Sequence, residues 1–421
     1  MYNQIYLYIE KHLSSFLFGF RKGYSTEECL IIMLEKWKQA LDKKSKAGAI
    51  LTDLSKAFDC LNHKLLIAKL HAYGFSIPSL EYIYSYLSER NQRTKIGSVS
   101  SSWKMIKTGV QQGSILGPLL FNIYMNDIFL FIPSPNVVSY ADDNTTYAME
   151  KDFETLITTL ENDTSIMMEW FKINEMKSNS DKCHLIIANN TDMCVHIHND
   201  IIPGNASVKL LGVTIDNKLN FTEHVTKLCK TASQKIHALA RVSNFMNSDK
   251  LRIIMKSFLE SQFNYCPLIW MFHNRTLNNR INKLHERALR LVYKDSKCTF
   301  SELLVKDKSF TIHERNLQKL AVEMFKIKNN LAPFLLSEIF SQYKPKYDLR
   351  NNRIWNNSNV RTVYYGKETL SYRGPKTWEL LPNSLRNVES LQEFKRKIKL
   401  WKPKGCTCRL CKSFIPDLGF L

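Results

Sequence analysis

Three aspartates stand where two apolar runs end, and they are the residues of this chain with the clearest capacity for chemistry. Asp53 closes the run "AGAILTD", and Asp142 and Asp143 follow "NVVSYA". Adjacent carboxylates repel each other and are costly to remove from water, so either solvent or a cation must relieve them. A solvated turn between two strands would need no cation, and the Asp-Asp pair by itself does not exclude that reading.

The cation reading depends on how the strands are arranged. If the strand that ends at Asp53 is a neighbour of the hairpin that carries Asp142 and Asp143, three carboxylates converge on one point. Hard divalent cations such as Mg²⁺ prefer such oxygen ligands. Two ions about 3.5–4 Å apart can activate an attacking hydroxyl and stabilise the leaving oxygen in phosphoryl transfer. Spacing along the chain does not show that the strands are neighbours.

The elements that must position these aspartates alternate between helices and strands up to about residue 220. "AGAILTDL" is typical of a short buried strand, and "VVSYADDNTTYAM" is typical of a hairpin. From about residue 222 the pattern is almost wholly helical, and after Pro333 it becomes irregular. We expect further helices over 23–44, 62–73, 78–89 and 152–171 and from near Ser114, a hairpin over 93–110, and strands over 183–189 and 208–216.

Charge is unevenly distributed along the 421 residues, whose formal net charge is +20. Residues 1–226 carry 22 Lys and Arg against 24 Asp and Glu, whereas residues 227–421 carry 37 against 15. Such a division is expected if one part does chemistry and the other holds a phosphate backbone. A basic surface that only confers solubility explains the composition equally well.

Composition also bears on compartment. Ten cysteines are scattered without framework spacing, which indicates a reducing compartment, and the start "MYNQIYLYIEKHLSS" has no signal-peptide pattern. We therefore expect a location inside the cell, in the nucleus, the cytoplasm or both, and no secretion. The most apolar stretch, 113–133, is interrupted by proline, asparagine and aspartate, so we expect a buried helix and not a membrane span.

Five segments that contain or flank these aspartates follow one another along the chain. They are "LTDLSKAFDCLNH", "GVQQGSILGPLLFNIYMND", "YADD", "WFKINEMKSNSDKCHLII" and "KLLGVTID". Together they resemble palm motifs A to E of reverse transcriptases, most closely the polymerases of non-LTR (LINE-type, Jockey-like) retrotransposons. "FGFRKGYST" is similar to the fingers motif that precedes motif A in that group. The resemblance covers roughly residues 16–225, and five motifs in order are far more specific than any one of them.

The resemblance implies an α+β fold: a right-hand polymerase palm, an antiparallel sheet with helices on one face, with partial fingers and a mostly helical basic thumb. It divides the chain into partial fingers (1–47), palm with a fingers insertion (48–221), thumb-like helices (222–332) and a basic C-terminal region (333–421). The implied function is RNA-directed DNA polymerase, with an RNA template, a DNA primer, dNTPs and two Mg²⁺ ions, or Mn²⁺ instead. It defines no oligomeric state and no membrane partner.

The resemblance also assigns roles to the aspartates and their neighbours. Asp53 and Asp142 are similar to the two metal-binding aspartates, Asp143 to the less essential carboxylate beside them, and the Leu54 carbonyl to a backbone ligand. Phe58 stands where the family has a steric gate against the ribose 2′-hydroxyl, and the alternative for Phe58 is a core aromatic.

Motifs B and D and the fingers motif add further candidates. Gln112 and Gly113 resemble the Gln-Gly of motif B, which contacts the nascent pair, although Gln111 stands where the family usually has proline. Lys182, in motif D, is expected to neutralise or protonate the departing pyrophosphate. Arg21, with Lys22, is expected to bind template phosphate or the triphosphate. Lys182 and Arg21 could equally be solvated surface cations.

Two other functions compete with the polymerase. Only one helix, with Lys11 as its sole cation, precedes "FGFRKGYST", so we expect an N-terminally truncated polymerase that extends primers poorly or not at all. A non-catalytic nucleic-acid-binding remnant of a mobile element is therefore the alternative. A two-metal nuclease explains neither motif B nor Phe58.

The chain ends in a cysteine cluster, "CTCRLCKSF". Cys406, Cys408 and Cys411 are close enough in sequence to share a zinc ion, but a tetrahedral site needs four ligands. No histidine or cysteine follows Cys411, and the nearest earlier cysteine is Cys298. The sequence therefore does not favour zinc at this cluster.

Overall fold

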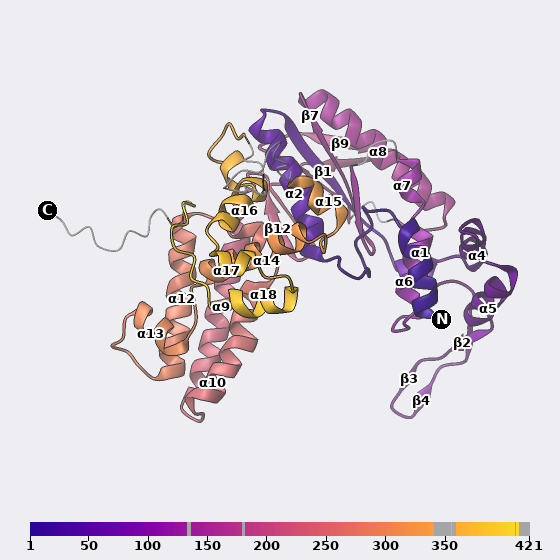
Figure 1. Cartoon of the computed structure of the whole chain (residues 1–421). Helices are drawn as coiled ribbons and strands as arrows, with labels where there is room; N and C mark the ends of the chain where they lie inside the picture. The colour runs from indigo at the N-terminus through magenta and orange to yellow at the C-terminus, as the bar shows by residue number, and fades with distance from the viewer. Residues whose placement is uncertain (133–135, 179–181, 341–354, 356–358, 409, 412–421) are drawn as a thin grey trace. The chain divides into compact units, whose positions relative to one another are not determined.

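The computed structural model describes residues 1–132, 136–178, 182–340, 355, 359–408 and 410–411 (Figure 1). The chain forms two compact units. Unit 1 comprises Met1–Ser25 and Lys46–Asn205, and unit 2 comprises Thr26–Ser45 and Ala206–Leu421. These units divide the chain differently from the four functional regions expected from sequence, and that four-part division stays a prediction.

Unit 1 is built on a four-stranded antiparallel sheet with the order β6-β7-β1-β8. The strands are β1 (Lys46–Asp53), β6 (Val137–Tyr140), β7 (Asp143–Glu150) and β8 (His184–Ile187). Helix α8 (Phe153–Ile173) packs on β1 and β7 through Leu156, Leu160 and other buried side chains that recur at helical spacing. The predicted strand before Asp53, the Asp142–Asp143 hairpin and the long helix are confirmed.

An N-terminal segment extends this sheet beyond β6. Phe18 donates its backbone N–H to the Ser139 carbonyl over 2.8 Å, and Ser139 donates its own to Phe16 over 3.0 Å. The segment follows helix α1 (Tyr2–Ile9) and a short 3-10 turn. It therefore covers backbone groups of β6 that would otherwise form an open sheet edge.

A second apolar core in unit 1 lies among the helices around the sheet. Asn62 caps α4 by accepting the backbone N–H groups of Lys64 and Leu65, and Gly74 follows that helix with φ +87°.

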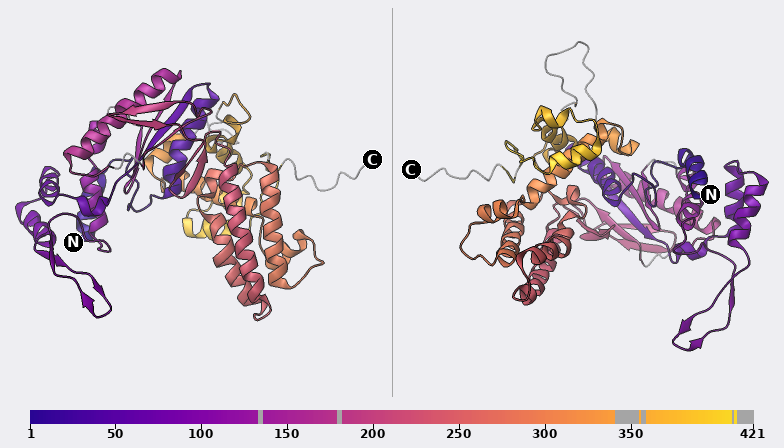
Figure 2. Two further views of the ribbon diagram at one scale, coloured as in Figure 1. Left: turned by 180° about the vertical axis from the view of Figure 1, so that it is seen from behind. Right: turned by 60° about the horizontal axis from the view of Figure 1, so that its bottom comes forward.

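A narrow arm of two strand pairs extends from the end of α5 (Figure 2), as the predicted hairpin requires. These elements are α3 (Ala57–Cys60), α4 (His63–Ala72), α5 (Ile77–Leu87), β2 (Arg90–Gln92), β3 (Lys95–Ile96), β4 (Val99–Ser100), β5 (Lys104–Ile106), α6 (Gly117–Met125) and α7 (Ile128–Phe131).

Two shorter hairpin pairs follow β8 along the chain. In unit 1, β9 (Cys194–Ile197) pairs with β10 (Asp200–Pro203). In unit 2, β11 (Ser207–Leu210) pairs with β12 (Val213–Asp216), which confirms the strands expected over 208–216.

Unit 2 contains α2 (Thr26–Asp42), although this helix precedes the palm strands in sequence. The run Leu30–Leu34 and Trp37 are buried, so α2 is buried around most of its circumference. Its carboxylates are buried as well: Glu27 accepts the backbone N–H of Leu268 over 2.9 Å. Asp42 accepts the backbone N–H groups of two residues of the C-terminal region, Arg361 and Thr362. Helix α2 is thus a core element of unit 2.

The remaining elements of unit 2 are helices, as the pattern after residue 222 predicts. Helices α9 and α12 pack against each other. They belong to a series comprising α9 (Thr222–Ser243), α10 (Ser248–Ile254), α11 (Pro267–Trp270), α12 (Arg275–Tyr293), α13 (Phe300–Asp307), α14 (Ile312–Lys328), α15 (Phe334–Ile339), α16 (Leu370–Glu379), α17 (Asn383–Arg386) and α18 (Leu391–Ile398).

The prediction of irregular structure after Pro333 is wrong where α15 to α18 form. Helix α16 contains Gly374 and Pro375, which weaken helix propensity in the sequence. A Cβ on Gly374 would lie 2.5 Å from Met324 Sδ, so the glycine permits close packing on α14. Burial of this contact offsets the helical hydrogen bond that Pro375 cannot donate, because proline has no backbone N–H. Most of the loop expected over 343–362 lies outside the described residues.

Two chemical features of the described residues bear on earlier expectations. No helix among them has both the length and the apolar character needed to cross a membrane. All ten cysteines are free thiols in the structure.

Candidate active site

The aspartates meet at one end of the sheet of unit 1. Strands β1 and β7 pair in a register that places Asp53 directly opposite Asp143. Asp142 lies in the two-residue turn between β6 and β7, where Ala141 has φ +57°. The condition that the sequence left open, that the two strands are neighbours, is therefore met.

The turn that carries Asp142 is closely packed from the N-terminal side. A Cβ on Gly19 would lie 2.4 Å from the backbone nitrogen of Ala141, so only glycine fits there. Asn122 of α6 donates its amide to the Gly19 carbonyl over 2.7 Å. Gly19, the first glycine of "FGFRKGYST", thus helps to hold the Asp142 turn in place, a role that the sequence analysis did not assign to it.

The three carboxylates influence one another electrostatically. Burial, followed by the charges of Asp142 and Asp53, raises the pKa of Asp143 to about 6. Lys182 Nζ forms an ion pair with Asp53 Oδ2 over 2.9 Å. The hydrogen bond to Asp53 raises the pKa of the exposed Lys182, which keeps it an ammonium group. Negative charge is therefore concentrated at this end of the sheet, and Lys182, one of the predicted site cations, forms an ion pair there.

The motif B loop is hydrogen-bonded to the segment that follows Asp53. Gly109 donates its N–H to the Leu61 carbonyl over 2.7 Å, and Val110 donates to the Phe58 carbonyl over 2.9 Å. Gly109 has φ +84°, and a Cβ there would lie 2.7 Å from the Asp59 Cα. Gln112 donates from Nε2 to Asp59 Oδ1 over 3.2 Å. The structure thus brings Gln112 next to the motif A segment.

Gly113 also adopts a left-handed conformation, with φ +82°, and has open space where a Cβ would lie. Glycine is therefore suited to this position by its backbone freedom, and the space is compatible with the close approach of another backbone.

Phe58 lies at the edge of the second apolar core. Its ring stacks on Phe121 with 4.5 Å between centroids and meets Phe20 edge-on at 5.7 Å. Phe58 is half-buried, and Phe121 is fully buried. One side of the Phe58 ring is therefore fixed by packing, and both alternatives for this residue, gate and core aromatic, stay compatible with its position.

Two residues that the sequence analysis did not single out hold the motif B loop. His63 Nε2 lies 2.8 Å from the Gly109 carbonyl oxygen, and Arg90 Nη2 donates to the same oxygen over 3.1 Å. His63 closes the segment "LTDLSKAFDCLNH", which is a weak signal in hindsight. The sequence gives no signal of this role for Arg90, because the contact depends on where β2, the first strand of the arm, starts in the fold.

Arg21 is used inside the protein. Its guanidinium forms an ion pair with Glu10 over 2.8 Å and donates to the carbonyl of Leu17 over 2.9 Å. It also lies 4.1 Å from the centre of the Tyr24 ring, and its side chain is only 4% exposed. This arrangement argues against the predicted contact with template phosphate or triphosphate. Lys22 beside it is exposed.

Leu54 directly follows Asp53 and is buried. Its backbone forms an isolated antiparallel bridge with Ser178, in the motif D segment, and Ser55 donates its N–H to the Lys177 carbonyl over 2.8 Å. Motif D is thereby attached beside Asp53. A metal-ligand role of the Leu54 carbonyl stays a prediction.

Comparison with known families identifies the chain. The model of the family described as "Reverse transcriptase (RNA-dependent DNA polymerase)" matches residues 1–215, which is half of the chain. The chain belongs to the reverse transcriptase family. Members of this family generally use divalent metal ions. Family membership and the antiparallel sheet with its helices together confirm the fold class expected from the motifs.

Curated relatives of this reverse transcriptase-family chain come from mobile elements. The RNA-directed DNA polymerase from mobile element jockey of Drosophila melanogaster is 27% identical over 298 residues, covering 68% of this chain and 32% of the relative. The probable RNA-directed DNA polymerase from transposon BS of the same species is also 27% identical, covering 65% of this chain and 32% of the relative. The chain spans about a third of the length of these relatives. The Jockey-like resemblance is confirmed.

A solved structure also aligns with this family member. Telomerase from Candida tropicalis, in complex with a fragment of telomeric RNA, aligns with 95% of this chain and 56% of its own chain, with a TM-score of 0.43 and 13% identity.

Proposed function

We propose that this chain is an RNA-directed DNA polymerase of a non-LTR retrotransposon that adds dNTPs to a DNA primer on an RNA template. The observation that carries the proposal is the register of β1 and β7, which sets Asp53 opposite Asp143 with Asp142 in the adjoining turn. Its place of action is inside the cell, in the nucleus, the cytoplasm or both, which the free cysteines support.

The donor set at this sheet end fits divalent cations. Three carboxylates on adjoining backbone positions supply hard oxygen ligands, and burial, followed by the charges of Asp142 and Asp53, raises the pKa of Asp143. Asp53 and Asp142, with the Leu54 carbonyl, would hold two Mg²⁺ ions, or Mn²⁺ instead. The bound ions would activate the primer hydroxyl and stabilise the leaving oxygen.

Other residues act on the substrates directly. Lys182 is exposed and kept protonated by Asp53, so it can neutralise or protonate the departing pyrophosphate. Gln112 and Gly113 lie on a loop bonded to the motif A segment, where an amide and an open backbone position can meet the nascent base pair. Phe58 is half-buried, and its ring is proposed as the barrier to a ribose 2′-hydroxyl.

Primer extension on an RNA template tests the proposal. The full-length chain is incubated with a labelled DNA primer annealed to RNA, dNTPs, and Mg²⁺ or Mn²⁺. We expect the primer to lengthen in a template-directed way and a chelator to stop the reaction. Binding of the primer–template without extension in either metal would overturn the proposal of polymerase activity and favour a second candidate function.

That second candidate is a non-catalytic protein that only binds nucleic acid. The state of Arg21 favours it, because the cation expected to bind the triphosphate is buried in an ion pair with Glu10. Positive charge placed on phosphates supplies much of phosphoryl-transfer catalysis. Binding and extension measured on the same preparation separate the two candidates.

Replacing Phe58 by valine is expected to weaken sugar discrimination. The preference for dNTP over rNTP, as a ratio of kcat/KM values, should fall about 10- to 100-fold, because the smaller side chain leaves room for the 2′-hydroxyl. The control is Phe121→Leu, which disturbs the same ring stack from its buried side. If the two variants lose stability alike and neither changes the ratio, Phe58 is a core aromatic.

The basic helices of unit 2 are proposed to bind the primer–template backbone. Arg280, Lys283 and Arg287 are exposed on α12 at spacings that place them on one helical face. Replacing all three by alanine should weaken binding. It should also reduce the slope of log affinity against log salt by about two to three, because each phosphate contact contributes roughly one.

A matched triple variant separates phosphate contacts from net charge. Lys43, Lys44 and Lys151 are also exposed, so their replacement by alanine removes the same charge from other places. Equal losses of affinity and slope in both triple variants would mean that the α12 face is not the binding surface.

A further inference from the structure

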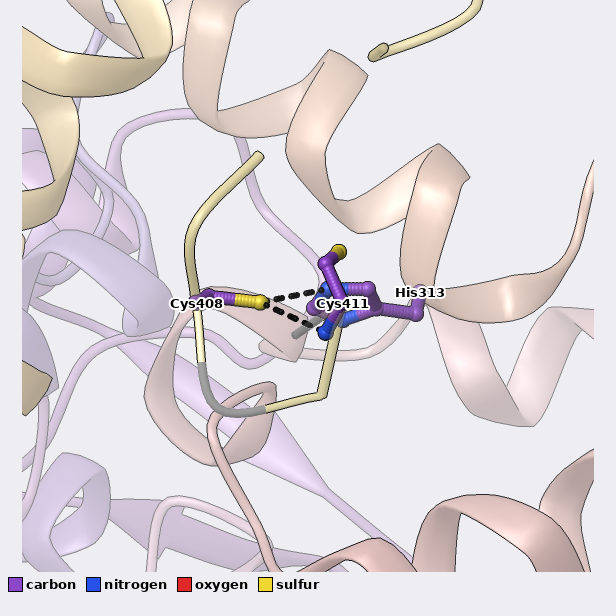
Figure 3. A group of neighbouring side chains, drawn as sticks. All are labelled: His313, Cys408 and Cys411. Carbon is purple, nitrogen blue, oxygen red and sulfur yellow. Dashed lines mark hydrogen bonds between the residues drawn. The ribbon is translucent and has the colours of Figure 1, made fainter. Parts of the chain in front are cut away.

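One histidine and two cysteines gather in unit 2 (Figure 3). His313 lies in the first turn of α14, and the cysteines follow α18 near the end of the chain. The ligand atoms of His313, Cys408 and Cys411 all lie within 4.8 Å of one another. Cys408 is fully buried, and His313 is 6% exposed. Sulfur and imidazole donors this close together form the kind of ligand set that zinc binds.

Cys406, two residues before Cys408, is the candidate for a fourth ligand. It lies outside the group of three whose ligand atoms are all within 4.8 Å of one another, but its thiol is near enough to those of Cys408 and Cys411 to interact with both. In a tetrahedral zinc centre, neighbouring ligand atoms lie about 3.5–3.8 Å apart, given the usual zinc–sulfur and zinc–nitrogen bond lengths. The distance of 3.2 Å between His313 Nε2 and Cys408 Sγ is close to that spacing. Cys406 must move toward the other three ligands to complete the tetrahedral arrangement.

The surroundings of the sulfur atoms supply a backbone hydrogen-bond donor and a nearby positive charge. The backbone N–H of Cys411 points at Cys408 Sγ over 3.4 Å, as Figure 3 shows. Arg373 lies near enough to Cys406 to act on it electrostatically, and its guanidinium is paired with Glu368 over 3.2 Å. Hydrogen-bond donors and positive charge around the first ligands are typical of protein metal sites.

The backbone holds both parts of the cluster. A capping box of Thr311 and Glu314 fixes the first turn of α14 and therefore the position of His313. Gln318, one turn further along the same helix, donates its amide to the Trp401 carbonyl over 2.8 Å. Gly405, with φ +79°, then lets the chain turn toward Cys406. The described residues from 401 to 411 form no helix or strand, so this segment depends on side-chain contacts for its place.

We propose that His313, Cys406, Cys408 and Cys411 bind one structural Zn²⁺ ion that fastens the C-terminal segment to α14. The sequence analysis disfavoured zinc because it sought the fourth ligand near the cysteines, whereas the fold brings it from a helix far earlier in the chain. Soft thiolates select zinc over the magnesium expected at the aspartates. All four ligands come from the protein, as in structural and not catalytic zinc sites. Binding releases the thiol protons to solvent.

Metal analysis of the purified full-length chain tests the proposal. Protein made in zinc-supplemented medium and purified with a thiol reductant should contain about one zinc per chain. Cys408→Ser and His313→Ala should each lower that content at least about tenfold. His313→Cys should keep it, because a fourth thiolate replaces the imidazole. Cys298→Ser, which removes a thiol outside the cluster, is the matched control and should leave the zinc content unchanged.

His273 provides the sharpest competing assignment. It is buried and lies near enough to His313 and Cys408 to interact electrostatically with both. Zinc that is lost in His273→Asn but retained in His313→Ala would overturn the ligand set proposed here. A wild-type chain with less than about a tenth of an equivalent of zinc would overturn the site altogether.

Alkylation mapping gives an answer that does not depend on whether the variants fold. In the wild-type chain, Cys406, Cys408 and Cys411 should resist a thiol reagent until a strong zinc chelator is added. Cys194 is exposed and should react with or without the chelator. Equal reactivity of the three cluster cysteines before and after chelation would contradict the proposal.

Discussion

Asp53→Asn and Asp142→Asn are each expected to reduce primer extension by at least about 1,000-fold, a loss of roughly 4 kcal/mol of transition-state stabilisation. The amide keeps the size of the carboxylate but removes the charge that holds the metal ions. Single-turnover extension with saturating dNTP and Mg²⁺ measures the effect without interference from product release. Far-UV circular dichroism and primer–template affinity should stay unchanged.

Asp143→Asn should cost much less. The motif resemblance makes Asp143 the less essential carboxylate beside the two metal-binding aspartates, and burial beside Asp142 and Asp53 raises its pKa to about 6. Asp192→Asn, at an exposed position, is the matched control for an aspartate-to-asparagine change. An Asp53 variant that retains about a tenth or more of the wild-type rate, with metal still required, would refute the assignment of this carboxylate as an essential ligand.

Glu35→Ala is expected to destabilise unit 2 by about 3 kcal/mol. Glu35 is buried on α2, and its two carboxylate oxygens accept the backbone N–H groups of Leu370 and Ser371 over 2.9 and 2.8 Å. These N–H groups belong to the first turn of α16, which has no acceptor of its own within the helix. Alanine leaves both of them buried without a partner.

Denaturant unfolding of the full-length chain measures this effect. The chain has two compact units, so the transition of unit 2 must be followed separately. Trp37, Trp270 and Trp378 are buried in unit 2, and their fluorescence reports on it. Glu35→Gln keeps an acceptor oxygen and should lose about half as much stability, whereas Lys43→Ala, an exposed position near the end of the same segment, should change it by less than about 0.5 kcal/mol. A Glu35→Ala variant as stable as the Lys43 variant would show that the capping contacts contribute nothing.

The place of α2 also affects how the basic half can be tested. A fragment ending near residue 226 would keep α2 but remove the helices that bury its apolar surface and donate backbone N–H groups to its carboxylates. Loss of binding by such a fragment would not distinguish missing phosphate contacts from misfolding. Substitutions on the α12 face, with matched substitutions elsewhere, avoid that ambiguity.

Much of the local structure was determined by the sequence itself. Alternation, apolar period and capping residues predicted β1, the β6–β7 hairpin, the arm and helices α4, α5 and α8, because these signals act within a few residues of one another. The aspartates at strand ends were also visible in the sequence, and the motif order identified the family before any contact was known. Local signals failed at α16, where the buried packing of Gly374 on α14 outweighs the low helix propensity of Gly374 and Pro375.

Only the tertiary structure decided which distant segments meet. The pairing of β1 with β7 sets Asp53 against Asp143, and the burial of Arg21 by Glu10 removes a cation that the motif assigned to phosphate. The sequence predicts a helix over 23–44 but not its partner, and the fold places α2 in the unit that contains the C-terminal half. His313 joins the terminal cysteines in the same way. Long-range partners are chosen by the surface that two segments bury together, and that quantity is a property of the pair and of neither segment alone.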